Sequence, residues 1–514
     1  MSFGRTTTAL AAGQAATPRT APRAGLAEGN RVLLPRRGAA AGEGGGMRRA
    51  GRRGVRAALV LLALAGGGSL AAPAAAQTGR FGSPGVPNIG PPEAALFPDL
   101  AALQDRLEEQ GWIIRGQATF ILQGHPRFRS PYQAGGSLHP APNARNTFSA
   151  DLILGRALWE GAEIIFNPSV TRGFGLSNSV GIAAFPNNEA FRLGSTPPVA
   201  WIPRLFLRQT IALSAETGPP DNDPLRFTRP LPTERITITL GRFSVWDIFD
   251  DNRYAHDART QFLNWALVGG AAFDYAADAR GFTNGATFEW ENGRWAVRLG
   301  AFQVAREVNS LPLDPSPFAA WQILASLERF WQINGREGAV RLIYGASRTR
   351  QSSWGELLAG GSFEANPTRR RLKHNIAVSF DQEMGPDWGV FGRFSWNDGR
   401  TQNWMFTEMD LAFSGGVAIQ GQRWGRPEDT LGLGFNVGFA SEGRRRYLAQ
   451  GGIGFITGDG KLRYRPEWVT EAYYDIRLAA GLNMALNYQL AVNPGYNADR
   501  GPVHLFALRL RTAF

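Results

Sequence analysis

The residue types that usually perform catalysis or hold metal ions form no recognisable motif in this chain. There is no cysteine, no Gly-x-Ser-x-Gly elbow and no phosphate-loop lysine, since the only lysines are Lys373 and Lys461. The five histidines are scattered without metal-ligand spacing: His125, His139, His256, His374 and His504. The sequence therefore predicts no enzyme, no cofactor and no bound metal.

Charged and polar side chains instead recur at every second position of several segments. Side chains alternate between the two faces of a β-strand, so each of these segments has one polar and one apolar face. The polar faces carry Asn375, Ser379, Asp381, Glu383, Arg393, Ser395, Glu408, Asp410, Glu471, Tyr473, Asp475, Arg477, Arg509 and Arg511. Carboxylates and guanidinium groups hydrogen-bond hydroxyls, and aromatic rings stack on C–H surfaces, so this mixture suits neutral polyols. A lining of one charge sign would instead indicate an ion path.

The last two segments show the alternation most clearly. In 502–514, Phe506, Leu508 and Leu510 share one face, Arg509 and Arg511 share the other, and the chain ends on an aromatic. Segment 481–492 repeats the pattern, and the connection NPGYNADRGP (493–502) is dense in turn formers. An apolar outer face that ends in an aromatic is typical of the closing strand of a bacterial outer-membrane β-barrel. We expect this strand to pair with the first one.

Seventeen segments have this two-residue period, and together they predict an all-β transmembrane antiparallel barrel over residues 112–514. They are 112–123, 146–158, 161–171, 199–214, 234–243, 281–290, 294–305, 318–331, 337–348, 373–384, 387–397, 403–414, 416–424, 431–441, 467–478, 481–492 and 502–514. Single-chain bacterial barrels have an even number of strands, so one assignment must be wrong. The pattern is weakest in 416–424, and we predict sixteen strands. Before the first strand, leucines three to four residues apart in 93–110 predict a short helix on the periplasmic or plug side.

Short and long connections between these segments are predicted to alternate, as in a membrane-spanning barrel. WENGRW and MGPDW provide short turns, whereas 172–198, 215–233, 244–280 and 349–372 are long. Segment 244–280 contains six large aromatic residues (Trp246, Phe249, Phe262, Trp265, Phe273 and Tyr275), which a solvated loop would not need. We expect it to fold inward and narrow the lumen.

The positive net charge of +12 belongs mostly to the N-terminal region. Residues 1–76 contain eleven arginines and two glutamates, a balance of +9, which leaves +3 for the remaining 438 residues. A nucleic-acid partner is therefore not expected. No run of eighteen apolar residues is present, which argues against a helical membrane protein, and the lack of cysteine suits passage through an oxidising periplasm.

The N-terminal region resembles a secretory leader behind an additional extension. Five arginines between Met47 and Arg56, the apolar run AALVLLALA (57–65) and the small residues Ala74–Ala76 form a signal peptide over 47–76 that would be cleaved before Gln77. The apolar run is too short for a membrane anchor. Residues 1–46 are low-complexity, and our hypothesis is that translation starts at Met47. Residues 77–111 read as a linker followed by the short helix.

Several long blocks resemble the carbohydrate-selective porins of the OprB type. The blocks are FNPSVTRGFGLSNSVGIAAFPNNEAFR (166–192), RLFLRQT (204–210), WDIFDDNRYAHDARTQFLNWAL (246–267), FDYAADARGFTNGATFEWENGRWAVRLGAF (273–302), FDQEMG (380–385), FGRFSWNDGRTQ (391–402), GQRWGRPEDTLGLGF (421–435), YLAQGGIGFITGDGKLRYRPEWVTEAYYDI (447–476) and NPGYNADRGPV (493–503). The resemblance covers about 111–514. It implies a sixteen-stranded channel of the cell outer membrane for passive uptake of glucose and related sugars.

The resemblance and the inward faces together suggest which residues line the pore. The candidates are Arg115, Trp246, Asp247, Asp250, Asp257, Arg259, Asp381, Glu383, Arg393, Glu408, Asp410, Glu471, Tyr473, Arg477 and Arg509. The family pattern implies an acidic residue after Pro168, where this chain has Ser169. Expected partners are small neutral sugars, outer-membrane lipid and, as an open alternative, further copies of the chain.

Other classes of protein fit the sequence less well. A general porin for other small solutes is the nearest alternative. A barrel enzyme such as a lipase needs a Ser–His pair at one rim, and the sequence suggests none. A receptor coupled to inner-membrane energy needs a large N-terminal plug domain, and a soluble lectin-like sandwich would not need so many strands or the terminal aromatic.

Overall fold

The computed structural model describes residues 98–190, 194–220, 223–360, 369–405 and 407–514, all of which belong to one compact unit, Ala71–Phe514. The predicted extension (1–46), the signal peptide (47–76) and most of the linker (77–97) lie outside the described residues. The predicted helix is present as α2 (Pro98–Glu109) and is followed by the first strand, as expected.

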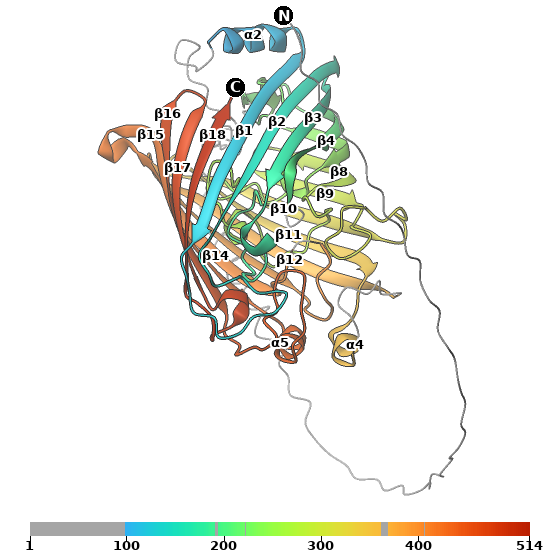
Figure 1. Ribbon diagram of the computed structural model, residues 1–514. Coiled ribbons are helices and arrows are strands. Elements are labelled where there is room, and N and C mark those ends of the chain that lie inside the picture. Colours follow the sequence, from blue (N-terminus) through green and yellow to red (C-terminus); the bar gives the residue numbers. More distant parts are fainter. Residues whose placement is uncertain (1–97, 191–193, 221–222, 361–368, 406) are drawn as a thin grey trace, which may run out of the picture. The chain divides into compact units, whose positions relative to one another are not determined.

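Within the described residues, sixteen antiparallel strands form a closed barrel, which confirms the predicted architecture and strand number (Figure 1). The wall consists of β1 (Trp112–His125), β2 (Asn143–Trp159), β3 (Ala162–Gly173), β4 (Ser195–Ala212), β7 (Arg235–Phe243), β8 (Thr283–Glu291), β9 (Trp295–Phe302), β10 (Trp321–Ile333), β11 (Arg336–Arg350), β12 (Arg370–Gly385), β13 (Trp388–Asn397), β14 (Leu411–Gly421), β15 (Arg426–Phe439), β16 (Glu467–Ala479), β17 (Leu482–Val492) and β18 (Val503–Ala513). Each strand pairs with its neighbours in the chain, and β4 pairs with β7.

The barrel closes between its first and last strands, as the terminal alternation predicts. Phe120 pairs with Leu510 and Ile121 pairs with Arg509 across β1 and β18. The amide of Phe514 donates to the carbonyl of Gly116 at 2.9 Å, and the Phe514 ring occupies the space that a side chain at position 116 would need. The terminal aromatic therefore seals the seam from outside.

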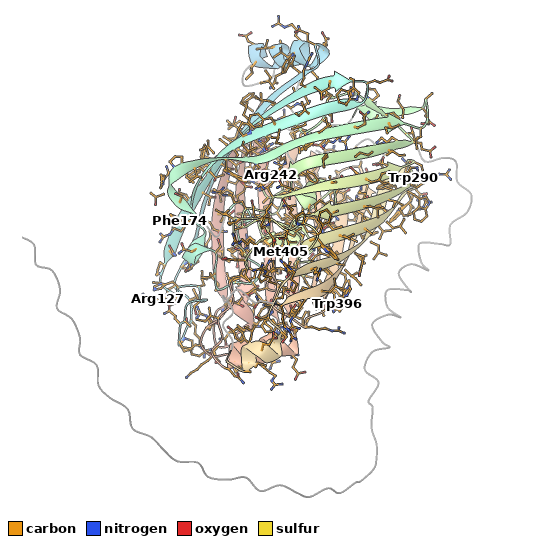
Figure 2. The ribbon with its side chains drawn as sticks, turned by 90° about the vertical axis from the view of Figure 1, so that its right-hand side faces the viewer. Arg127, Phe174, Arg242, Trp290, Trp396 and Met405 are labelled. Carbon is orange, nitrogen blue, oxygen red and sulfur yellow. The ribbon has the colours of Figure 1, made fainter. Side chains whose placement is uncertain are left out.

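The two faces of the wall differ as the alternation requires. Leu240, Leu486 and Phe506 on the outer face are 59%, 53% and 55% exposed. On the inner face, Asp381 is fully buried and Arg509 is 2% exposed. Figure 2 shows the side chains along the strands, and the labelled Met405 is fully buried. The wall thus separates an apolar exterior from a polar interior.

One strand assignment from the sequence is wrong. The sequence singles out 416–424 as the excess segment, but β14 (Leu411–Gly421) runs through the glycine pair that precedes it, and residues 403–405 and 407–410 lie outside any strand. The carboxylate of Asp274 accepts the backbone amides of Trp404 (2.6 Å) and Met405 (3.0 Å). Because a side chain takes these amides, they do not enter a strand ladder.

The two ends of the barrel carry connections of different length. We call the end where β1 begins and β18 ends the turn end, and the opposite end the loop end. At the turn end β16 and β17 are joined by a tight turn in which Gly481 has φ +71°, a backbone conformation that favours glycine. Figure 1 shows α2 at the turn end and α4 (Trp354–Leu358) and α5 (Glu442–Ala449) at the loop end.

Segment 215–233 departs from the predicted alternation of connections. It is long, as expected, but it joins β4 to β7 at the turn end rather than at the loop end. It contains a small separate sheet of β5 (Thr217–Pro220) and β6 (Pro230–Pro232).

None of the helices in the described ranges is long and apolar enough to cross a membrane.

Candidate functional site

The connection between β7 and β8, residues 244–282, is called the inward segment. It contains a short turn of helix, η3 (Val245–Asp247), and the helix α3 (Trp265–Val268). Its aromatic residues Phe249, Phe262, Trp265 and Phe273 are at most 1% exposed. Trp246 packs on Tyr275 with ring centres 5.0 Å apart. The prediction that this stretch packs rather than being solvated is confirmed.

Inner-wall arginines fasten the start of the inward segment to two strands far apart around the barrel. Arg204 of β4 forms a bidentate pair with Asp247, with contacts of 2.7 and 2.8 Å. Arg393 of β13 places its Nε 2.8 Å from Asp250 and donates from Nη1 to the carbonyl of Leu267 at 2.7 Å. Because β4 and β13 are not neighbours in the wall, one segment that reaches both must cross the interior.

The middle of the inward segment is held by β16 and β18. The carboxylate of Glu471 accepts the backbone amides of Leu263 (2.6 Å) and Asn264 (2.9 Å). Arg509 donates to the carbonyls of Ala258 and Gln261, both at 2.7 Å, and pairs with Asp475 on its other nitrogen at 2.9 Å. These buried charges therefore satisfy backbone groups that no strand ladder would satisfy.

The end of the inward segment is fastened to the third side of the barrel. Asn375 of β12 accepts the amide of Asp274 at 3.2 Å, and Gln322 of β10 exchanges hydrogen bonds with the backbone of Asp274 and Ala276. The segment therefore contacts strands all around the barrel, which confirms that it narrows the lumen.

A second connection, between β3 and β4, also enters the barrel. Glu467 accepts the amides of Ala183 (3.0 Å) and Ala184 (2.7 Å). The amide of Trp265 donates to the carbonyl of Phe185 at 3.2 Å, so this connection lies against the inward segment. The sequence predicts 172–198 only as a long connection, and Glu467 is not among the predicted site residues. The apolar run Ile182–Phe185 is the signal that would have indicated packing.

Arg259 of the inward segment forms a charge cluster with this second connection and the wall. Its guanidinium pairs with Asp151 of β2 and with Glu189, the latter at 3.0 Å, and its amide donates to Asp257 at 2.9 Å. Burial opposes the charge on Arg259, but these carboxylates outweigh burial and raise the pKa of the guanidinium above its ordinary value. Arg259 thus stays charged inside the barrel.

Asp151 supplies a carboxylate beside the position where the family pattern implies one. Ser169 pairs with Asp151 across β2 and β3, and Ser169 hydrogen-bonds the Asp151 carboxylate. The sequence shows Asp151 on the inner parity of its strand, but the register between two strands was needed to place it beside Ser169. The residue therefore escaped the sequence-based candidates.

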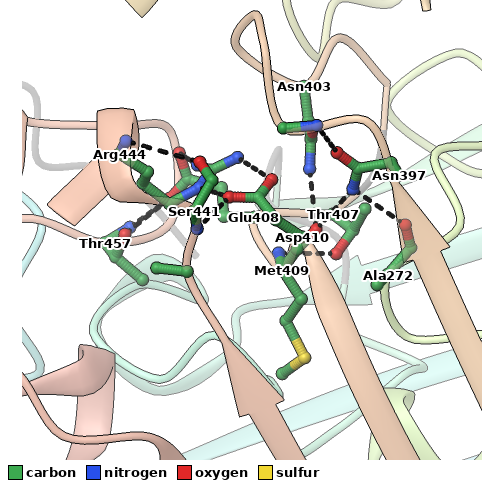
Figure 3. A network of polar contacts seen from close by, with 12 residues as sticks. Ala272, Asn397, Asn403, Thr407, Glu408, Met409, Asp410, Ser441, Arg444 and Thr457 are labelled. Carbon is green, nitrogen blue, oxygen red and sulfur yellow. Dashed lines mark hydrogen bonds and ion pairs between the residues drawn. The ribbon is translucent and has the colours of Figure 1, made fainter. Parts of the chain in front are cut away.

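Glu408 and Asp410 belong to a network at the loop end, shown in Figure 3. Arg444 of α5 pairs with Asp410 at 2.9 Å and with Glu408 at 3.3 Å. Glu408 also accepts the amides of Ile456 (2.9 Å) and Thr457 (2.6 Å). Burial disfavours the charge on Arg444, but the carboxylates prevail and raise the pKa of its guanidinium. Both acids were predicted to lie on a strand, which is wrong. They lie in the connection between β13 and β14 and fasten it to the connection between β15 and β16, which contains α5.

The remaining sequence candidates lie along the wall towards the turn end. Asp381 pairs with Arg341 at 2.5 Å, and Glu383 lies 3.7 Å from Arg336. Arg115 donates to three carbonyls of residues 223–226 and to Glu108 of α2, so it fastens the β4–β7 connection. Arg259, Tyr473 and Arg477 line a pocket of about 260 Å³ at the turn end, called the turn-end pocket. No cluster of three or more possible metal ligands occurs among the described residues.

A closed barrel of this size with an apolar outer wall and a narrowed, polar interior is the architecture of an outer-membrane porin. The family model of the carbohydrate-selective porins, OprB family, matches residues 135–514, and the chain belongs to this family. The resemblance stated from the sequence is therefore confirmed, together with a function in carbohydrate-selective passage across the outer membrane.

Solved porin structures resemble this chain in fold. The high-pH structure of OprB from Pseudomonas putida is 16% identical, covers 81% of this chain and 97% of its own, and superposes with a TM-score of 0.61. The low-pH structure of the same porin has 13% identity and a TM-score of 0.45, with the same coverage. The channel DcaP of Acinetobacter baumannii has 10% identity and a TM-score of 0.42, covering 79% of this chain and 96% of its own. No curated protein matches the sequence.

Proposed function

We propose that this porin passes small neutral sugars, glucose and related monosaccharides, by passive diffusion, and that the inward segment forms its constriction. The observation that carries the proposal is the way in which this segment is fastened. Its anchoring arginines each face a carboxylate: Arg204 faces Asp247, Arg393 faces Asp250, Arg259 faces Asp151 and Arg509 faces Asp475. The charges cancel in pairs, so the constriction offers hydrogen-bonding groups without a field of one sign.

A paired lining discriminates by hydrogen bonding rather than by net charge. A channel selective for anions or cations needs an excess of one sign along its path. A hydroxylated solute can instead exchange its hydration water for fixed donors and acceptors. Among the sequence candidates, Asp247, Asp250, Arg259, Arg393, Glu471 and Arg509 hold the constriction in shape. We propose that the half-buried Asp247 and Arg259 contact the passing sugar, whereas the four buried residues act through the shape that they hold.

We propose further that lipid covers the outer wall and that the turn end faces the periplasm. The exposed apolar residues of the outer face support the first point, because such a wall in water would be an aggregation surface. Short turns on the periplasmic side are the rule for bacterial barrels, which supports the second. The inward charges also support the assignment, since a charge facing hydrocarbon at the midplane costs about 2–4 kcal/mol.

Liposome swelling tests the proposed selectivity. Purified protein reconstituted into liposomes should admit glucose faster than gluconate, which is of similar size but anionic. A general porin would admit both at similar rates, and that result would overturn the carbohydrate preference. Absence of any sugar entry, with correctly inserted barrels, would overturn the proposed function as a whole. Empty liposomes and liposomes carrying heat-denatured protein are the controls.

A further inference from the structure

The turn-end pocket lies on the opposite side of the inward segment from the loop end. Its walls come from the inward segment, from the turns between β12 and β13, β14 and β15, and β16 and β17, and from the last residues of β18. A solute that has passed the constriction therefore meets this pocket before it leaves the barrel. The side chains with hydrogen-bonding groups that line it include Tyr254, Gln261, Tyr473, Arg477 and Asn483.

Tyr473 is built into the wall of this pocket with its hydroxyl unused. The residue is 2% exposed, and its ring fills the space that a side chain on Gly432 would need. Phe262 meets the ring edge-on with centres 4.9 Å apart, and the Arg509 guanidinium lies 6.0 Å from the ring centre. Within the described part of the chain, the Tyr473 hydroxyl has no hydrogen-bond partner. A buried phenol that is held this firmly and lines a pocket can donate to a ligand.

A second tyrosine is seated in the same way from the opposite element. Tyr254 belongs to the inward segment, is 5% exposed, and its phenol occupies the space that a side chain on Gly389 of β13 would need. Two glycines therefore make room for two aromatic rings at one pocket. Aromatic rings provide apolar faces for the C–H surfaces of a sugar ring, and their hydroxyls provide polar edges.

Most charges that line the turn-end pocket have a partner of opposite sign. Arg477 pairs with Glu428 at 2.8 Å, and Arg253 pairs with Glu337 at 2.8 Å. Asp475 accepts from Asn483 at 2.5 Å and pairs with Arg509. The groups are thus fixed by one another and leave no strong preference for an ion. Pockets for drug-sized ligands are roughly 300–1,000 Å³, so about 260 Å³ suits one smaller ring.

We infer that the turn-end pocket is a binding site for a single neutral monosaccharide, separate from the constriction and occupied on the periplasmic side of it. The inference rests on the proposed function, because the site would bind the same sugar that the channel is proposed to pass. Tyr473 and Tyr254 provide the platform, and the Tyr473 hydroxyl donates to a sugar oxygen. A sugar that enters from the turn end reaches this site without crossing the inward segment.

One-sided sugar block of single channels in planar bilayers tests the inference. Since the chain has no cysteine, a single Arg446→Cys change on the exposed face of α5 reports orientation through a membrane-impermeant thiol reagent. With glucose on the turn side, the dwell time of block should fall about two- to tenfold in Tyr473→Phe, the equivalent of one hydrogen bond. Tyr488→Phe on the outer wall is the matched control and should leave the dwell time unchanged, because that hydroxyl contacts His504 instead.

Each outcome of this experiment decides a point. Shorter block in Tyr473→Phe from the turn side, with glucose still entering liposomes, supports the site. Unchanged block together with normal glucose entry overturns the site and leaves the proposed function standing. Longer block by glucose 6-phosphate than by glucose overturns the neutral class of ligand. Failure of glucose to enter liposomes overturns the proposed function itself, independently of the pocket.

Discussion

Arg393 of β13 holds Asp250 of the inward segment with its Nε 2.8 Å from Oδ2, and both side chains are at most 2% exposed. The same guanidinium donates to the carbonyls of Leu267 (2.7 Å) and Ala255 (2.5 Å), so one side chain closes three parts of the segment onto the wall. Asp250 adopts φ +55°, a conformation that non-glycine residues rarely keep without support. Arg393 therefore supports this turn from the wall.

Replacing Arg393 with alanine should open the constriction. Removing one partner of a buried ion pair leaves an uncompensated charge and costs about 3–5 kcal/mol, which here acts on the inward segment rather than on the wall ladder. Single-channel conductance should rise, and the preference of liposome swelling for glucose over gluconate should fall. The matched control is Arg329→Ala, since Arg329 lies over Trp295 on the outer face. Equal conductance in Arg393→Ala and the parent would show that the segment is held without this anchor.

The outer wall should respond to charge according to depth. Leu486 lies midway along β17 and is 53% exposed, whereas Leu478 lies near the turn end of β16 and is 51% exposed. Arginine at the midplane of a barrel wall costs about 2–4 kcal/mol and near the interface only about 0–1. Leu486→Arg should therefore lower the free energy of unfolding in lipid far more than Leu478→Arg, as measured by urea titration in vesicles. Equal losses would contradict a lipid-covered wall.

The barrel was predictable from the sequence because its signal is local. The alternation that places Arg509 inside and Phe506 outside depends only on the period of a strand. The rule that such barrels have an even number of strands then reduced seventeen candidate segments to the sixteen observed. The predicted number of sixteen strands is right, but the segment singled out as excess, 416–424, lies largely within β14. The glycine pair in β14 obscures the period, and Asp274, which lies far away in the chain, draws residues 403–405 out of the ladder.

The roles of the candidate residues depended on contacts that no local pattern contains. Most inner-wall charges were predicted only to face the lumen, but Glu471 and Arg393 hold backbone groups of the inward segment. Arg115 fastens a turn-end connection, and Glu408 fastens two at the loop end. The aromatic content of 244–280 did predict packing, because burial of large rings is a compositional signal. Which wall residue meets which loop atom is decided by register and topology.

Acid should weaken the loop-end network through Asp410. Burial alone would raise the pKa of Asp410, but Arg444 outweighs burial and lowers it below the usual value of 3.8. A carboxyl whose pKa is lower in the folded state contributes stability above its unfolded pKa and loses it as the pH falls through the folded pKa. Protease resistance of the loop end should therefore decline below about pH 3.8, and the decline should be shallower in Asp410→Asn.

A control for the acid experiment is available in the same network. Asp410→Asn should lower resistance at neutral pH, because Arg444 then lacks its nearest carboxylate. Glu442→Gln, an exposed change at the start of α5, should leave the whole profile unchanged. A parent profile that is flat down to pH 3 would mean that folding does not lower the pKa of Asp410 and that its charge does not stabilise the loop end.

The pairing of Asp151 with Ser169 predicts that the carboxylate can be moved from one strand to the next. Asp151→Ser should remove the charge that faces Arg259, leaving Glu189 as its partner, and should reduce glucose selectivity over gluconate. Ser169→Asp added to that change returns a carboxylate to the adjacent inner-wall position and should restore part of the selectivity. Coupling between residues in contact is typically about 0.5–3 kcal/mol, so a double-mutant cycle on the unfolding free energy should show it. Additive effects of the two changes would mean that position 169 does not reach Arg259, and the charge would then be specific to β2.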